Sequence, residues 1–387
     1  MSLVGTQVRG IITPIINPGD DLVKIVTDSL VASAKENGFG INEGDVVCVT
    51  EAVVAISQGN FATLDDIAKD VETKFGGRKH IGLVHPSPVS RNRFLNILKG
   101  ISGGVDKLTV LVSPVDEVGN ALISDYNPYE IDSRLYSMDE FVAKYGKPKH
   151  IFTGVDYLEV FRKACDNIEI FVSPNPSDIL KFSKQVIAGT IHTRHKLKEH
   201  LIKKGAQKVV LLSDILSSPV DGSGCNPEYG LLGSNMAGDN KVKLFPHSGK
   251  EFAVSLQAEI FRQLGVTVHC MVYGDGAFKD PQGGIWELAD PVVSPGYTDG
   301  LRGTAKPEVK LKNLVAKFDK LSKADREAKI RKLIDEQDKL KIDDDMRLGT
   351  TPRQLPDLLG SLADLVTGSG SRGTPVVLVQ DYFSSKF

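Results

Sequence analysis

The stretch that sets the architecture of this chain is Gly44-Asp45-Val46-Val47-Cys48-Val49-Thr50-Glu51. Its first two residues are typical of a turn, and the apolar, β-branched run after them predicts a buried strand. Glu51 follows that run directly, so the sequence predicts a carboxylate at the end of a buried strand. Residues 52–57 and a turn at Gly59 complete the unit.

A β-like opening and a helix precede this strand. Residues 8–16 are rich in apolar and β-branched side chains, and the turn Asn17-Pro18-Gly19-Asp20 follows them. From Asp20 to about Lys35 the apolar spacing predicts an amphipathic helix. We expect Asp20 to be its N-cap, because a short acidic side chain accepts hydrogen bonds from the first free helix amides.

Helices and β-rich runs alternate between residues 62 and 220, an order typical of α/β structure. The predicted strands are 80–84, 108–112, 168–172 and 208–212. A Gly-, Ser- and Asn-rich stretch at 213–250 is longer than the usual connection between two elements of a compact domain, so we expect a functional loop there. Residues 306–345 are highly charged and have high helix propensity, which predicts a solvent-exposed helical segment.

Charge and hydropathy argue against nucleic acid and membranes as partners. The 387 residues carry 47 basic and 49 acidic side chains, a net charge of −2, which gives no strong field for a polyanion or an anionic membrane. No apolar run approaches the roughly 18 residues of a membrane-spanning helix, so we expect a cytoplasmic protein. The four cysteines stand far apart without a CxxC pair, and we expect them to be reduced.

The segment Gly274-Asp275-Gly276-Ala277-Phe278-Lys279-Asp280 follows a predicted strand at 266–273. It contains the carboxylates that are the strongest candidates for a functional role. Asp275 and Asp280 lie in a glycine-rich turn that allows close approach of a ligand, and such oxygen ligands suit Mg²⁺ or Mn²⁺. Lys279 between them could contact a phosphate, and Glu287 and Asp290 could complete an acidic cluster. The alternative is ordinary Asp-Gly turn chemistry.

Three other segments carry candidate chemistry. Asp214 and Asp221 also stand at a strand end and a turn, where local hydrogen bonding is the competing explanation. Ser90, Arg91 and Arg93 come just before or at the start of a predicted helix, and hydroxyl, guanidinium and free amides together suit an anion.

The loop at residues 368–373 formally spells GxGxxG. The order here is helix, loop, strand, whereas a dinucleotide fingerprint needs strand, glycines, helix. A tight turn is therefore favoured, with Arg372 as a contact for an anion. The Walker pattern GxxxxGK[ST] is absent from the sequence, so a nucleotide would be held by something other than a P-loop.

Several blocks of the chain resemble coenzyme F420-0:L-glutamate ligases (F420 γ-glutamyl ligases). The similarity touches roughly 180 residues. The similar blocks are PIINPGDDL at 14–22, GDVVCVTE at 44–51, SQG at 57–59, GLLGSN at 230–235 leading to LFP at 244–246, the segment 268–290, and the tail 357–379.

The resemblance implies an α+β fold with a mixed sheet and large α/β insertions, and an intertwined homodimer. It divides the chain into a ligase-like core and two insertions. The core would comprise 1–61, 221–302 with the metal site, and 349–387; the insertions would be an α/β region at 62–220 and a charged helical segment at 303–348.

The resemblance also implies the chemistry. It predicts GTP-dependent amide formation between a carboxylate-bearing small molecule and L-glutamate through an acyl phosphate, with Mg²⁺ or Mn²⁺ and a monovalent cation. Asp275 falls where the family has a metal-binding aspartate, so Asp275 and Lys279 become the predicted catalytic residues. The further predicted metal ligands are Asp280, Glu51 and Asp214. We expect an anionic substrate to be bound by Ser90, Arg91 and Arg93.

The predicted nucleotide contacts are Ile15, Ile16, Asn17, Asn235 and Arg372. Two departures from the family stand among these blocks. The aspartate of the family's Gly-x-Asp-x-Ser-Asn block is Leu232 here, and Glu51, Asp214 or Asp221 could replace it. The family's lysine in the opening loop is Asn17. Two alternatives stay open: a ligase for a folate-like or other acceptor, and a non-catalytic binding protein of the same fold.

Overall fold

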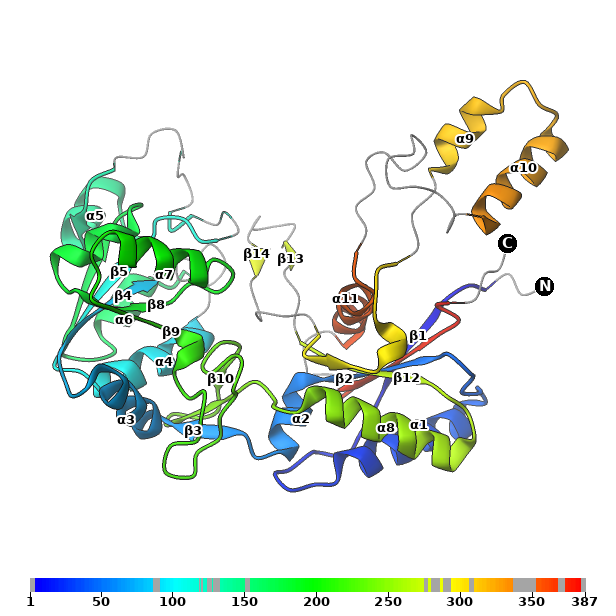
Figure 1. Ribbon diagram of the computed structural model, residues 1–387, viewed down its shortest axis with the longest axis horizontal. Coiled ribbons are helices and arrows are strands. Elements are labelled where there is room, and N and C mark those ends of the chain that lie inside the picture. The colour runs from blue at the N-terminus through cyan, green and yellow to red at the C-terminus, as the bar shows by residue number, and fades with distance from the viewer. Residues whose placement is uncertain are drawn as a thin grey trace.

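The computed structural model describes residues 4–85, 91–117, 119, 121–123, 127, 133–149, 154–274, 278–279, 286–287, 294–305, 310–336, 353–367 and 373–383. Side chains are described for all of these except residues 91–93, 278–279, 286–287 and 335. The fold is α+β, with two lobes that each surround their own sheet (Figure 1).

The five-strand lobe is built on a sheet of order β1-β16-β2-β12-β15. Its strands are β1 (Gln7–Ile11), β2 (Val46–Thr50), β12 (His269–Tyr273), β15 (Gly296–Tyr297) and β16 (Val376–Gln380). Its helices are α1 (Leu22–Asn37), α2 (Glu51–Ser57), α8 (Gly249–Leu264), α11 (Leu355–Thr367) and the 3₁₀ turn η4 (Asp299–Leu301). β2 is the central strand, parallel to β12 and antiparallel to β16.

The predicted buried strand at residues 46–50 is confirmed, and both of its faces are covered. Val47 and Val49 pack in a cluster with α1 and α8, whereas Val46 and Cys48 pack in another with α11. Because successive side chains of a strand point to opposite faces, a continuous apolar run is what a strand between two layers of helices requires.

Two expectations at the start of the chain are wrong. β1 ends at Ile11, so residues 12–16 are a loop rather than strand; Pro14 has no amide hydrogen for a sheet ladder. The N-cap of α1 is Asp21, whose carboxylate accepts from the Lys24 amide at 3.1 Å. The Asp20 carboxylate instead accepts from the Asn17 amide at 2.7 Å and closes the preceding turn.

The six-strand lobe contains a sheet of order β6-β7-β5-β4-β8-β9. Its strands are β4 (His80–His85), β5 (Lys107–Val112), β6 (Tyr136–Ser137), β7 (Ile168–Val172), β8 (Gln185–Ala188) and β9 (Lys208–Leu211). Its helical elements are α3 (Leu64–Phe75), α4 (Arg91–Gly103), α5 (Met138–Tyr145), α6 (Tyr157–Arg162), η2 (Pro176–Lys181), α7 (Arg194–Lys203) and η3 (Leu212–Asp214).

All strands of this sheet are parallel to their neighbours except β6. The four strands predicted between residues 80 and 212 are confirmed as β4, β5, β7 and β9, whereas β8 was not predicted. One face packs on α3, α4 and α6, and the other packs on η2 and α7. Apolar residues that alternate along β4 and β5 divide between these two cores, as parallel strands covered by helices require.

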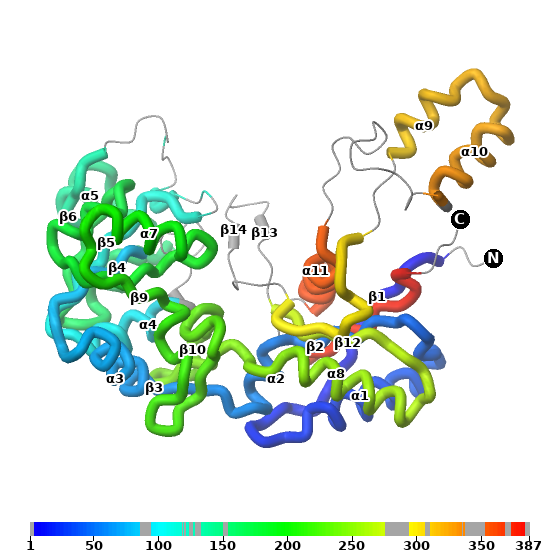
Figure 2. Tube along the Cα trace, in the orientation of Figure 1, coloured from blue at the N-terminus to red at the C-terminus, as the bar shows by residue number. Residues whose placement is uncertain are grey.

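A small sheet of order β10-β11-β3 lies between the lobes (Figure 2). It contains β3 (Phe61–Thr63), which follows α2, and β10 (Asn235–Met236) and β11 (Lys241–Lys243), which precede α8. The pair β13 (Phe278–Lys279) and β14 (Trp286–Glu287) forms a separate two-stranded ladder. Helices α9 (Leu311–Lys317) and α10 (Lys323–Asp335) project from the five-strand lobe (Figure 1), where the sequence predicted a charged helical segment.

Candidate active site

A cavity of about 420 Å³ opens where one edge of the five-stranded sheet faces the small sheet between the lobes. β1, β2 and β12 end at this edge, and β16 begins there. The cavity is lined by Thr13, Pro14, Ile15, Ile16, Thr50, Glu51, Ala52, Val53, Asn235, Lys243, Tyr273, Asp364, Thr367, Gly373, Thr374 and Pro375. Its volume falls in the usual range for a small-molecule site.

The main charged feature of the cavity is an ion pair between Lys243 and Glu51. The Lys243 Nζ atom lies 2.7 Å from Oε1 and 2.5 Å from Oε2 of Glu51. Both residues are buried, with 7% of Lys243 and 5% of Glu51 exposed. Each would be costly to bury alone, because a desolvated charge without a partner is strongly unfavourable. The pair therefore keeps one ammonium and one carboxylate inside the cavity.

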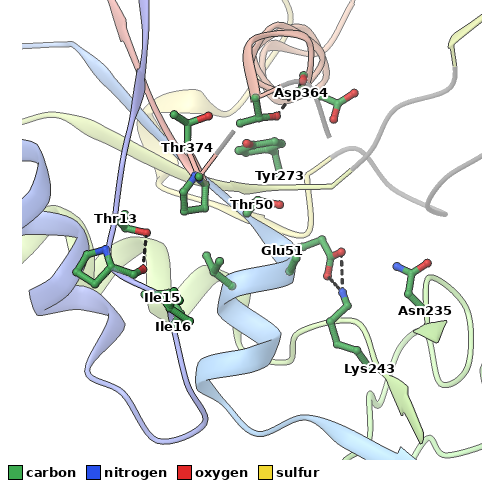
Figure 3. A pocket seen from close by; sticks show the side chains of 16 residues that line it. Thr13, Ile15, Ile16, Thr50, Glu51, Asn235, Lys243, Tyr273, Asp364 and Thr374 are labelled. Atoms are coloured by element: carbon green, nitrogen blue, oxygen red, sulfur yellow. Dashed lines mark hydrogen bonds and ion pairs between the residues drawn. The ribbon is translucent and has the colours of Figure 1, made fainter. Parts of the chain in front are cut away.

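The two partners come from different sheets. Glu51 is the first residue of α2, directly after the central strand, and Lys243 ends β11 of the small sheet. Asn235 on β10 lies opposite Lys243 in the antiparallel register. Figure 3 shows Asn235 and Lys243 entering the cavity from the small sheet, with Glu51 reaching toward Lys243 from the large one.

Further polar groups line the wall formed by β12, α11 and the start of β16 (Figure 3). Tyr273 is the last residue of β12, and Asp364 is on α11. The Thr374 hydroxyl oxygen is buried and has no hydrogen-bond partner among the described residues. A buried hydroxyl without a partner is unfavourable, and a ligand oxygen or nitrogen in the cavity would remove that cost.

The structure brings together four of the residues predicted from the sequence. Glu51, Ile15, Ile16 and Asn235 all line the cavity. Ile16 is buried, whereas 88% of Ile15 is exposed at the cavity rim. Asn17 does not line the cavity; its backbone and amide group contact the Asp20 carboxylate in the turn before α1.

Other predicted residues lie in the six-strand lobe or its surroundings. The Asp214 carboxylate accepts from the Leu211 amide at 2.9 Å and lies 3.6 Å from the Lys198 ammonium. Asp221 forms an exposed ion pair with Lys69. Neither lines the cavity that contains Glu51. Leu232 is buried in the core of the six-strand lobe and takes no part in that cavity.

The remaining predictions fall outside the described residues or their described side chains. Asp275, Asp280, Asp290, Arg372 and Ser90 lie outside the described residues. Lys279 and Glu287 are placed in β13 and β14, and Arg91 and Arg93 in α4, but their side chains lie outside the description. Asp275 stands two residues after Tyr273 in the sequence.

The described side chains do not complete a metal centre. No group of three or more His, Cys, Asp or Glu side chains within the described ranges could hold an ion. In the cavity, both oxygens of Glu51 contact the Lys243 ammonium. That leaves Asp364 as the other lining carboxylate, whereas Mg²⁺ or Mn²⁺ requires several oxygen ligands.

Sequence reasoning missed Lys243, Asp364 and Thr374. Lys243 stands in the alternation Lys241-Val242-Lys243, which is typical of a strand with one solvated face, and Lys241 is indeed exposed. The burial of Lys243 can be recognised only in the folded chain, where its ammonium contacts Glu51, 192 positions away. The long stretch at 213–250 was the available signal, and it contains both Asn235 and Lys243.

The arrangement can hold anionic oxygens. The cavity is bordered by the Lys243 ammonium with its Glu51 partner, the Asp364 carboxylate, the Asn235 side-chain amide and several hydroxyl groups, beside apolar walls. The donors among these groups, the Lys243 ammonium and the Asn235 amide, can each bond an anionic oxygen, and such bonds are stronger where water is excluded. Such a site suits a carboxylate or a phosphate.

Comparison with protein families gives a match to the family described as F420-0:Gamma-glutamyl ligase, over residues 10–381. A search of curated proteins finds no match. None of the helices in the described ranges has the length and apolar character needed to cross a bilayer. Because the family match covers nearly the whole chain, the chain belongs to the F420-0:gamma-glutamyl ligase family.

Proposed function

We propose that this family member is a nucleotide-dependent γ-glutamyl ligase whose reaction takes place in the cavity around Glu51 and Lys243. In the proposed reaction a carboxylate of a small-molecule acceptor attacks the γ-phosphate of GTP and forms an acyl phosphate, with release of GDP. The amine of L-glutamate then attacks the acyl carbon, an amide forms, and inorganic phosphate leaves.

The buried Lys243–Glu51 pair is the observation that carries the proposal. A reaction through an acyl phosphate places negative charge on phosphoryl and carboxyl oxygens, so a preorganised cation in a dry cavity stabilises it. Lys243 would donate to an anionic oxygen of the phosphate or the acceptor, and Glu51 would hold the ammonium in place. Asn235 would supply a second donor from the neighbouring strand.

The walls of the cavity support the exclusion of water. Pro14, Ile16, Val53 and Pro375 form apolar surface beside the charged pair. An acyl phosphate is hydrolysed by water, so a ligase needs surroundings that admit glutamate's amine and exclude solvent. The exposed Ile15 side chain at the rim would become buried when a ligand covers it.

A divalent metal remains part of the proposal through residues outside the described ranges. We infer that Asp275 and Asp280 hold Mg²⁺ or Mn²⁺. When bound, the ion would neutralise charge on the phosphates. Replacement of Asp275 with Asn should abolish metal-dependent turnover, and full metal-dependent turnover in that variant would overturn this assignment.

The direct test measures phosphate release from GTP in the presence of L-glutamate, Mn²⁺ and a panel of carboxylate acceptors, with coenzyme F420-0 and a folate among them. Product formation is followed by mass, since amide ligation adds one glutamate residue to the acceptor. Release of phosphate that requires both glutamate and one acceptor would identify the substrate. Nucleotide binding without any turnover across the panel would instead indicate a non-catalytic relative.

The charge of Lys243 can be tested against a matched lysine on the same strand. Lys243→Gln should reduce turnover by at least about 100-fold, as does loss of a group that stabilises transition-state charge. Lys241→Gln, two positions earlier and exposed, should leave turnover unchanged. The double variant Glu51→Gln/Lys243→Gln removes both buried charges, so it should fold well and remain inactive. Activity in that folded double variant would contradict the proposed role of Lys243.

A further inference from the structure

The five-strand lobe has a groove of about 800 Å³ between β1 and α1. Residues 9–12 form its strand side, and Ser29, Ala32, Ser33 and Glu36 are among the residues that form its helix side. Within the described part of the chain, the groove and the candidate active site have no lining residue in common. The groove is therefore a separate feature of this lobe.

β1 is the edge strand of the five-stranded sheet and pairs with β16 on one side. In an antiparallel pair, every second residue directs its amide and carbonyl groups away from the neighbouring strand. The groove lies along β1, and Gly10, which is exposed and has no side chain, leaves the main chain of the strand accessible there. Such an edge is a template for pairing with another extended chain.

The helix side of the groove leaves room for the side chains of an added strand. Ser29, Ala32 and Ser33 are small, and their spacing places them on one face of α1. On the strand side Ile11 is buried, whereas 69% of Ile12 is exposed. A segment beside β1 would direct alternate side chains toward α1, and it would remove the exposed surface of Ile12 from water.

Two charged side chains line the groove. The Arg9 guanidinium lies over the Phe39 ring, 4.6 Å from its centroid, and donates to the side-chain oxygens of Gln380 at 2.5 Å and Gln7 at 2.6 Å. Both acceptors are neutral, and a guanidinium has further N–H donors, so Arg9 can also bind a carboxylate. Glu36 is exposed in the last turn of α1, where the helix dipole disfavours an anion and favours a cation beside it.

We propose that this groove binds an extended segment of another protein, which joins the five-stranded sheet as a strand beside β1. The segment would have an acidic side chain opposite Arg9, a basic side chain opposite Glu36, and an apolar side chain over Ile12. Hydrogen bonds to the main chain of β1 would provide affinity, and the two charged positions would provide specificity.

A second copy of this chain suits the groove less well than a separate extended segment. Antiparallel pairing of two β1 strands about a two-fold axis keeps the same faces of both sheets on one side. The second α1 would then approach the groove that the first α1 already borders. A segment without a helix of its own avoids this crowding.

The first test selects phage-displayed random peptides of about ten residues, longer than β1, against the whole chain. Synthetic copies of the selected peptides are then titrated against the wild-type chain, Ala32→Trp and Ala258→Trp. Both alanines are exposed, on α1 and α8 respectively. Ala32→Trp should weaken binding at least about tenfold because its ring fills the groove, and Ala258→Trp should bind as the wild type does. Recovery of no binding peptide, or equal binding to all three proteins, would overturn the proposal.

A charge exchange then tests the predicted chemistry of the segment. Glu36→Lys should weaken binding of a selected peptide about fivefold, and replacement of the facing basic residue of the peptide with Glu should restore it. Glu251→Lys, at an exposed position of α8, is the matched control and should leave binding unchanged. An equal effect of both substitutions, with no restoration by the altered peptide, would contradict the assignment of Glu36.

Two further measurements separate an added strand from other ways of covering the groove. Peptide binding should slow amide hydrogen exchange in the fragment that contains residues 7–12, and unchanged exchange there would contradict a strand beside β1. Light scattering should give the same molar mass for the wild-type chain and Ala32→Trp. A dimer that dissociates in Ala32→Trp but not in Ala258→Trp would assign the groove to a second copy and overturn the proposal.

Discussion

The two lobes place their cavities at equivalent positions of their sheets and line them with different charged groups. Both cavities lie beyond the carboxyl ends of parallel strands, β2 and β12 in one lobe and β4, β5 and β8 in the other. In the five-strand lobe the small sheet adds a lysine to that edge. In the six-strand lobe the chain adds Glu117, which occupies the free helix amides. The edge of the sheet thus determines where each cavity forms, and a neighbouring segment determines which charged groups line it.

The largest effect that tests this comparison is the loss of one partner of the buried pair. Lys243→Gln leaves the Glu51 carboxylate buried without its cation, which should lower the free energy of unfolding by about 3–5 kcal/mol. Glu51→Gln/Lys243→Gln should recover most of that loss, because neither charge remains. Urea denaturation of the two variants, with Lys241→Gln as the exposed control, measures the difference. Equal stability of the single and double variants would show that the two charges are not coupled.

A smaller effect is expected for the carboxylate that occupies the start of α7. Glu117→Gln keeps the shape of the side chain and one acceptor oxygen but loses the charge-assisted bonds to three backbone amides. The free energy of unfolding should fall by about 1–2 kcal/mol. Glu199→Gln, on the exposed face of α7, is the matched control and should change stability by less than about 0.5 kcal/mol. An equal fall in the free energy of unfolding in both variants would show that the hydrogen bonds of Glu117 to the amides of α7 add no stability beyond a general effect of negative charge near that helix.

The third prediction applies one isosteric change to both cavities. Thr374 in the first and Thr190 in the second each have a buried hydroxyl without a partner among the described residues. Thr374→Val should raise the free energy of unfolding by up to about 1 kcal/mol while it lowers ligase turnover about tenfold. Thr190→Val should have the same sign of effect on stability and should leave turnover unchanged. A loss of stability in Thr374→Val would mean that this hydroxyl already has a partner in the folded chain.

Much of the strand pattern could be predicted from the sequence because burial on two faces leaves a continuous apolar run. The run at residues 46–50 and the four predicted strands of the six-strand lobe have this character. β8 (Gln185–Ala188) was not predicted, although it is as long as β9, which was. Without β8 the strand order cannot be deduced, so the cavity beyond the ends of β4 and β8 could not be anticipated.

The candidate site was predictable only in part, because its residues meet in space from distant parts of the chain. Glu51 and Asp214 both stand at strand ends, and no sequence pattern favours one of them over the other. The structure separates them, since they belong to different sheets with different neighbours. Lys243 had the pattern of a solvated lysine, and its burial depends on a carboxylate on another sheet.

The smallest predicted effect concerns the pH dependence of the five-strand lobe. His269 begins β12, its ring packs edge-on against Phe383 at 5.7 Å, and a Cβ atom built at Gly300 would lie 2.1 Å from that ring. Burial lowers the pKa of His269, while the Glu43 carboxylate acts in the opposite direction. The unfolded chain therefore binds a proton more readily than the folded one. The stabilising contribution is complete above the unfolded pKa, about 6.5, and is lost as pH falls toward the lower folded pKa.

Urea denaturation between pH 7 and pH 5 measures this contribution. The wild-type chain should lose stability over that range, and His269→Gln should lose less, because the variant has no ring that must stay neutral in the folded state. His195→Gln, at an exposed position of α7, serves as the control and should retain the wild-type dependence. A wild-type slope in His269→Gln would assign the pH dependence to other groups and would show that the edge of β12 tolerates a charged imidazole.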